Sequence, residues 1–171
     1  MKGEYTFAVA DSIELVADDK SGRYRELLPQ LEALVSGEPD LIANLANLSA
    51  GLMQGVIAAS WVGFYFLRGR ELVLGPFQGK IACVRIALGR GVCGTAAAEG
   101  RMVVVPDVDQ FPGHIACDAA SRSEIVVPVR DPSGRLVAVL DVDSSQLAAF
   151  DDTDATALAR VAALAGSLAG W

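Results

Sequence analysis

Two β-prone runs meet at a turn in the stretch EIVVPVRDPSGRLVAVLDV, residues 124–142. The turn is DPSG at 131–134, where Asp, Pro, Ser and Gly all favour a reversal of the chain. The flanking runs, 124–129 and 136–142, are rich in Val, Ile and Leu, as β-strands are. The stretch therefore predicts an antiparallel β-hairpin.

Further β-prone runs precede this hairpin. An aromatic-rich run at 60–67 and a second run at 72–77 predict another hairpin. Shorter runs at 81–87 and 102–105 predict two more strands, and a glycine-rich bend followed by a short helix around 95–99 separates them. The sheet is therefore expected to hold six strands.

Helical periodicity lies on both sides of the strands. Apolar residues recur at helical spacing from about Arg23 to Gly37, and Asp40 is placed to cap a second helix that runs to about Gly55. Asp151 or Asp152 is placed to cap a final helix. Strands bracketed by helices predict a single α/β (α+β) domain with a central antiparallel sheet and helices mainly on one face. We assign this domain to residues 23–171 and leave residues 1–22 unassigned.

Charge and hydropathy exclude several classes of partner. The 14 basic and 21 acidic residues give a net charge of −7, and the basic residues are scattered, which argues against a nucleic-acid partner. No apolar run has the length of a membrane span, and the N-terminus lacks the apolar core of a signal peptide. We therefore expect a cytoplasmic protein with no membrane partner.

The three cysteines, Cys83, Cys93 and Cys117, are the compositional feature with the most chemical meaning. His114 is the only histidine, and the spacing of these residues matches no zinc motif, so no metal site is expected and His114 is given no role. Two interpretations remain open for each cysteine: a small apolar residue of the core, or a redox-active thiol. Cys117 lies in the long aperiodic segment 107–122, and long loops of this kind tend to be functional.

Three acidic residues cluster at the ends of the 124–142 hairpin. Asp141 and Asp143 are two apart and share one face of a strand, and the turn aligns them with Glu124. Crowded, desolvated carboxyls keep a proton near neutral pH, which suits a general acid. The alternative is a set of solvated strand-end acids.

Trp61 and Tyr65 are four residues apart in the first aromatic run, so on a strand they share a face. Such a pair belongs either to the core or to the wall of an apolar site.

Several of these segments together resemble the free methionine-(R)-sulfoxide reductases, a family with the GAF fold. The segments are SWVGFY at 60–65, GPFQGK at 75–80, IAC at 81–83, GVCG at 91–94, PDV at 106–108, HIACD at 114–118, SEIVVP at 123–128 and LDVDS at 140–144. Four of these motifs recur in part in other GAF domains and so indicate only the fold: GVCG, PDV, SEIVVP and LDVDS. The three cysteine motifs combined with WVGFY are more specific for the reductase family. The resemblance spans about residues 24–168.

The resemblance implies an enzyme that reduces free L-methionine-(R)-sulfoxide to methionine. In that family's pattern Cys117 is the nucleophile, Cys83 is the resolving cysteine and Cys93 is a possible secondary recycling thiol. The pattern also implies an intramolecular disulfide reduced by thioredoxin, no cofactor, a homodimer and a role in oxidative stress.

For the side chains around the substrate, the resemblance implies two functions. Glu124 and Asp143 act as the acid or bind the substrate ammonium group, and Trp61, Tyr65 and Asp141 help to bind the substrate. Which carboxyl is the acid stays open. The rival interpretation is a stand-alone GAF sensor for a small nucleotide-type ligand.

Overall fold

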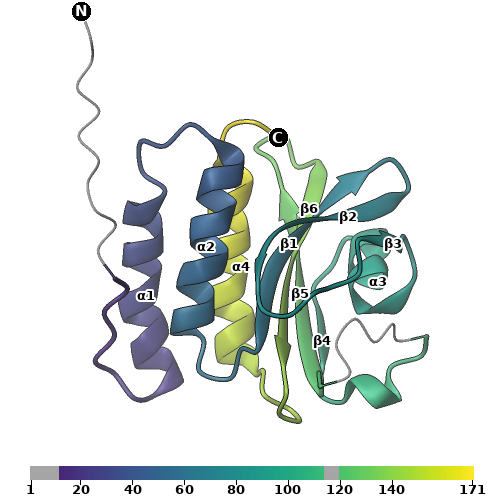
Figure 1. The fold of residues 1–171 in the computed structure, drawn as a ribbon, viewed down its shortest axis with the longest axis horizontal. Coiled ribbons are helices and arrows are strands. Elements are labelled where there is room, and N and C mark those ends of the chain that lie inside the picture. Colours follow the sequence, from purple (N-terminus) through teal and green to yellow (C-terminus); the bar gives the residue numbers. More distant parts are fainter. Residues whose placement is uncertain (1–11, 114–119) are drawn as a thin grey trace, which may run out of the picture.

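A computed structural model of the chain describes residues 12–113 and 120–171. In this part of the chain six strands form one antiparallel sheet in the order β3-β2-β1-β6-β5-β4 (Figure 1). The strands are β1 (Trp61–Arg68), β2 (Glu71–Gln78), β3 (Arg85–Ala87), β4 (Val103–Val105), β5 (Ser123–Arg130) and β6 (Leu136–Ser144). The predicted 124–142 hairpin is confirmed as β5 and β6, with Val127 opposite Leu140.

Helices cover the two faces of the sheet unequally. On one face α2 (Leu41–Gly55) packs on β1 and β2, α4 (Asp152–Ser167) packs on β5 and β6, and α1 (Lys20–Leu34) forms an outer layer (Figure 1). On the other face lies α3 (Gly91–Glu99), followed after β4 by the short 3-10 helix η1 (Val108–Gln110). The predicted α+β fold, with helices mainly on one face, is confirmed.

Each face of the sheet has its own hydrophobic core, because successive strand residues point to opposite faces. On the three-helix face, Phe64 and Leu140 pack with the apolar sides of α1, α2 and α4. On the α3 face, Trp61, Tyr65 and Val139 pack with residues of α3. The alternation of strand side chains between the two faces therefore separates a large core under the three helices from a smaller core on the α3 side, which surrounds buried polar side chains.

Polar contacts fix the ends of the helices. The Asp40 side chain accepts from the backbone N–H of Ala43 at the start of α2, as predicted. Asp151 caps α4 in a capping box with Asp154. Asp154 also accepts a 2.8 Å hydrogen bond from the Tyr24 hydroxyl, which ties α1 to α4 in the buried interior.

Three predicted boundaries were wrong. The strand expected at 81–87 is only Arg85–Ala87, and Cys83 lies in the loop before it rather than at a strand start. The first helix begins at Lys20, capped by Asp19, instead of near Arg23. The short helix expected around 95–99 begins at Gly91, because the glycine-rich bend forms its first turn. No helix among the described residues is long and apolar enough to cross a membrane.

Candidate active site

Strand pairing brings the three predicted carboxyls together on the α3 face. Glu124 on β5 is the register partner of Asp143 on β6, and Asp143 is in turn the partner of Trp61 on β1. Asp141, two residues before Asp143, points to the same face and lies opposite Gly63. The predicted convergence of Glu124, Asp141 and Asp143 is therefore present in the sheet.

Two of these carboxyls are buried together with a thiol from α3. Glu124 and Asp141 are each 6% exposed, and their carboxyls are hydrogen-bonded to each other. The Cys93 Sγ lies 3.8 Å from Glu124 Oε1, to which the thiol donates. Asp141 Oδ1 has no hydrogen-bond partner among the described residues. A buried acceptor without a partner is costly, so this atom is available to a ligand that donates a proton or a hydrogen bond.

The electrostatics of the cluster keep protons on it. Burial raises the pKa of Glu124 well above its usual range, and the nearby charges of Asp141 and Asp143 raise it further. Burial also raises the pKa of Asp141, and the Asp143 charge adds to the shift. Two adjacent desolvated carboxylates repel each other, so the Glu124–Asp141 pair keeps a proton to higher pH than exposed carboxyls do. The cluster can therefore donate a proton to a bound molecule.

An aromatic wall adjoins the carboxyls. The Trp61 ring stacks on Tyr65 with centroids 6.0 Å apart and on Phe77 with centroids 5.3 Å apart. Its indole N–H donates a 3.0 Å hydrogen bond to the carbonyl of Lys80. Trp61 and Tyr65 are buried in the α3-side core, and burial followed by the charge of Asp141 raises the pKa of Tyr65. The two residues are thus core residues and neighbours of the acids at once.

Sequence reasoning missed two contributors to this wall. Phe77 lies in a β-prone run and in the GPFQGK motif, but nothing in its spacing indicated that it would stack on Trp61. Gly63 leaves room for both rings, since a Cβ at that position would come within 2.5 Å of Trp61 Cη2 and of Phe77 Cβ. A glycine inside a strand is a recognised sign of such close approach.

The described cysteines lie in different environments. Cys93, on α3, is a free and buried thiol, and burial followed by the charges of Asp141 and Glu124 raises its pKa. Cys83, in the loop after β2, is half-buried and disulfide-bonded. Cys117 and His114 lie outside the described residues. The structure therefore joins Cys93 to the carboxyls, whereas the role of Cys117 stays a prediction.

Cys93, Glu124 and Asp141 are also the described group that could hold a metal ion. One potential ligand atom from each lies within 4.8 Å of the others. Thiolates and carboxylates bind metals only after they lose their protons, and the raised pKa values of all three oppose that loss. The group suits proton transfer better than metal binding.

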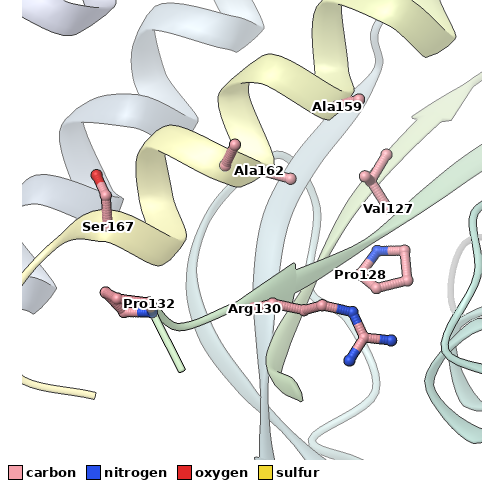
Figure 2. Close-up of a pocket in the computed structure, with 8 residues that line it drawn as sticks. Val127, Pro128, Arg130, Pro132, Ala159, Ala162 and Ser167 are labelled. Carbon is pink, nitrogen blue, oxygen red and sulfur yellow. The ribbon is translucent and has the colours of Figure 1, made fainter. Parts of the chain in front are cut away.

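Two hollows lie on the three-helix side of the described chain, away from the carboxyl cluster. One, of about 360 Å³, lies between β5 and α4 and is lined mainly by Ala, Val and Pro side chains (Figure 2). Its one charged side chain, Arg130, already donates to the carbonyls of Gly134 and Gly100. The other, of about 470 Å³, lies between α1 and α4 and has Arg25 and Arg160 in its lining. Neither hollow is lined by a residue of the carboxyl cluster.

Comparison with known proteins identifies the fold family. The model of the GAF domain matches residues 36–168, well over half of the chain. The chain belongs to the GAF domain family. This confirms the fold family that the sequence motifs indicate.

The relatives of this GAF protein include enzymes. It is 48% identical over 145 residues to the free methionine-R-sulfoxide reductase of Escherichia coli (strain K12), with 85% of this chain and 87% of the relative covered. The free methionine-R-sulfoxide reductase of Saccharomyces cerevisiae is 41% identical over 146 residues, with 81% of each chain covered. A solved structure of the Neisseria meningitidis free methionine-R-sulfoxide reductase, in complex with its substrate, superposes with a TM-score of 0.87. It is 52% identical and covers 91% of this chain and 93% of that chain. The predicted resemblance to these reductases is thus confirmed.

Proposed function

We propose that this GAF protein is a free methionine-(R)-sulfoxide reductase that converts free L-methionine-(R)-sulfoxide to L-methionine with thiols as the reductant. The observation that carries the proposal is the buried Glu124–Asp141 pair beside the Trp61 wall, where burial raises the pKa of both carboxyls and so favours proton retention. Reduction of a sulfoxide requires such a proton for the oxygen that leaves sulfur. High identity to reductases from bacteria and yeast supports the same assignment.

The proposed reaction uses two cysteines. The Cys117 thiolate attacks the sulfur of the sulfoxide, and a carboxyl of the cluster protonates the sulfoxide oxygen. This oxygen is transferred to the Cys117 sulfur, which becomes a sulfenic acid, and methionine departs. The Cys83 thiol then condenses with the sulfenic acid, and a disulfide forms as water leaves. One sulfoxide and two thiols thus give one sulfide, one disulfide and one water. The disulfide-bonded state of Cys83 supports its assignment as the resolving cysteine.

The carboxyls are assigned two roles, proton donation and binding of the substrate ammonium group. Glu124 and Asp141, which share a proton, supply the acid, and the half-buried Asp143 binds the ammonium group of the amino-acid substrate. The Asp141 Oδ1 atom, without a partner among the described residues, is an acceptor for the same ammonium group. Trp61 and Tyr65 form the apolar side of the site. A free amino acid is then recognised by its charge as well as by its sulfoxide.

The buried position of Cys93 bears on the role that the resemblance allows it. A recycling thiol must meet an external or neighbouring sulfur as a thiolate, and burial disfavours both access and ionisation. We therefore assign Cys93 to holding the Glu124 carboxyl in place. The proposal adds thioredoxin as the reductant, a cytoplasmic location, a homodimeric state and no cofactor, all of which rest on the family resemblance.

A thiol count tests the proposal directly. Fully reduced protein, freed of small thiols, is mixed with excess free methionine-(R)-sulfoxide, and its remaining thiols are titrated and mapped by mass spectrometry. We expect one equivalent of methionine, the loss of two thiols and a Cys83–Cys117 disulfide. The S epimer and a peptide-bound sulfoxide serve as controls for specificity. Three intact thiols after exposure to excess substrate would contradict the proposal and favour a sensor that binds without reaction.

A further inference from the structure

Two exposed apolar side chains flank Cys83 in the loop between β2 and β3. The side chain of Ile81 is 91% exposed and that of Val84 is 64% exposed, although the surrounding loop is well anchored. The Lys80 carbonyl accepts from the Trp61 indole over 3.0 Å, and the Val84 carbonyl accepts from the Leu74 backbone over 3.0 Å. The two side chains are thus held outward by a fixed backbone on either side of a half-buried, disulfide-bonded cysteine.

The charge around this loop differs from that of the rest of the chain. Residues 72–98 contain three basic residues, Lys80, Arg85 and Arg90, and no acidic residue, in a chain whose net charge is −7. All three are exposed, and Arg85 forms an ion pair with Glu71. Lys80 and Arg85, the chain neighbours of Ile81 and Val84, therefore give the apolar pair a basic rim, which suits a partner with an acidic rim around an apolar centre.

Thiol–disulfide exchange places strict demands on such a partner. The incoming thiolate must bond directly to a sulfur of the disulfide, so a protein reductant has to cover the residues on both sides of that sulfur. Apolar side chains that are nearly fully exposed are the ones that gain most from being covered. The position of Ile81 and Val84, two residues before and one residue after Cys83, matches this requirement.

We propose that Ile81 and Val84, with the basic rim of Lys80 and Arg85, are the docking surface for the protein dithiol that reduces the Cys83 disulfide. The inference rests on the proposed function, since it supplies the partner for the last step of that reaction. The partner's thiolate attacks the Cys83 sulfur, and the other sulfur of the disulfide leaves as a thiolate and takes up a proton. The partner's second thiol loses its proton and attacks the mixed disulfide, which frees the Cys83 thiol. The partner is oxidised by two electrons and the chain is reduced by two.

The test measures disulfide reduction alone, without any sulfoxide. The full-length protein is oxidised with diamide, the reagent is removed, and reduced thioredoxin or dithiothreitol is added in excess while the appearance of Cys83 thiol is followed by quenched alkylation. The test variant is Ile81→Ser with Val84→Ser. The control variant is Val16→Ser with Ile42→Ser, which replaces residues that are 87% and 54% exposed on the three-helix side of the fold.

We expect the second-order rate constant with thioredoxin to fall about tenfold in the test variant, as the loss of two apolar contacts predicts. The rate constant with dithiothreitol should stay within about twofold of the original, because a small dithiol needs no docking surface. The control variant should match the original protein with both reductants. Added salt should slow the thioredoxin reaction and leave the dithiothreitol reaction unchanged, because it screens the basic rim.

Two results would overturn the inference. An unchanged thioredoxin rate constant in the test variant would place the docking surface elsewhere, and an equal fall with both reductants would show that Ile81 and Val84 act on the disulfide itself. Failure of the proposed function would give a different result. The reduced protein would then keep its thiols in the presence of methionine-(R)-sulfoxide, whereas the rate constants for disulfide reduction by thioredoxin and by dithiothreitol could still be measured.

Discussion

The Cys93 thiol donates a hydrogen bond to Glu124 across the α3–sheet interface, with Sγ and Oε1 3.8 Å apart. The bond joins a helix to a strand 31 residues away in the sequence. Both side chains are buried, so neither can exchange this partner for bulk water. The contact fixes the position of a carboxyl that we assign to proton donation.

Replacement of Cys93 separates a positioning role from a recycling role. Cys93→Ser keeps a hydrogen-bond donor for Glu124, so we expect thioredoxin-driven turnover within about threefold of the original. Cys93→Ala leaves a buried carboxyl oxygen without its donor, which costs about 1–3 kcal/mol. The alanine variant should therefore show a kcat about tenfold lower and a shifted pH profile. Steady-state assays of both variants give the comparison, with Cys83→Ser as the variant that loses recycling. Loss of thioredoxin turnover in Cys93→Ser, with a normal first turnover, would instead assign recycling to Cys93.

The protonated carboxyls also predict how stability depends on pH. The pKa of Glu124 is raised in the folded state, so its stabilising contribution is complete below its ordinary value of 4.5 and is lost as the pH rises through the raised value. Each pH unit in that interval lowers the free energy of unfolding by about 1.4 kcal/mol for one group. The wild-type protein should therefore become less stable between pH 5 and pH 8.

Glu124→Gln removes this titration and should flatten the pH profile, with a higher urea midpoint than the original protein at pH 8 and a lower kcat. Urea unfolding of the reduced proteins at the two pH values measures the effect. Glu14→Gln, at an exposed residue, is the control and should leave the profile unchanged. An equal pH slope in Glu124→Gln and in the original protein would show that the cluster carries no extra proton in the folded state.

The sequence predicts the sheet better than it predicts what covers the sheet. The turn at 131–134 and the β-prone runs on either side of it predict the β5–β6 hairpin and bring Glu124 near Asp143. The exact register depends also on an irregularity in the pairing between Val129 and Arg130, which shifts it by one residue and places Glu124 opposite Asp143. The contact between Cys93 and Glu124 depends on where α3 lies over the sheet, which no local pattern encodes. The stacking of Phe77 on Trp61 depends in the same way on tertiary packing.

The loop around Cys83 shows a different limit of sequence reasoning. Ile81 and Val84 have strong β propensity, and the run 81–87 accordingly predicts a strand. The observed β3 is a three-residue strand at the edge of the sheet, and Ile81 and Val84, which lie before it, are exposed. Propensity reports which residues fit a strand, but pairing partners decide whether one forms.

Gly63 provides a test of the aromatic wall. In Gly63→Ala the new methyl group would lie 2.5 Å from both Trp61 Cη2 and Phe77 Cβ, so the Trp61 ring must move. We expect KM for methionine-(R)-sulfoxide to rise about tenfold, because small displacements of positioning groups have effects of this order. Gly69→Asn, in the turn after β1, is the control, because its φ of +62° is one that Asn tolerates and no atom lies within 4 Å of a Cβ there. An unchanged KM in Gly63→Ala would separate Trp61 from the substrate.

Gly166 on α4 provides a test of the structural core in which two effects have opposite signs. Helix propensity favours Gly166→Ala by about 1 kcal/mol. The new Cβ, however, would lie 2.0 Å from the backbone carbonyl oxygen of Arg130, where α4 passes over the end of β5 (Figure 2). A backbone atom cannot move aside as a flexible side chain can, and overpacking of this kind costs about 1–3 kcal/mol or more.

We therefore expect Gly166→Ala to lower the urea midpoint, whereas Ser167→Ala, one residue further along and exposed, should leave it nearly unchanged. Near-normal sulfoxide reduction per folded molecule is expected in both variants, because this part of α4 lies on the opposite face of the sheet from Glu124 and Asp141. A higher midpoint in Gly166→Ala would mean that propensity outweighs the close approach, and that α4 has room to shift away from β5.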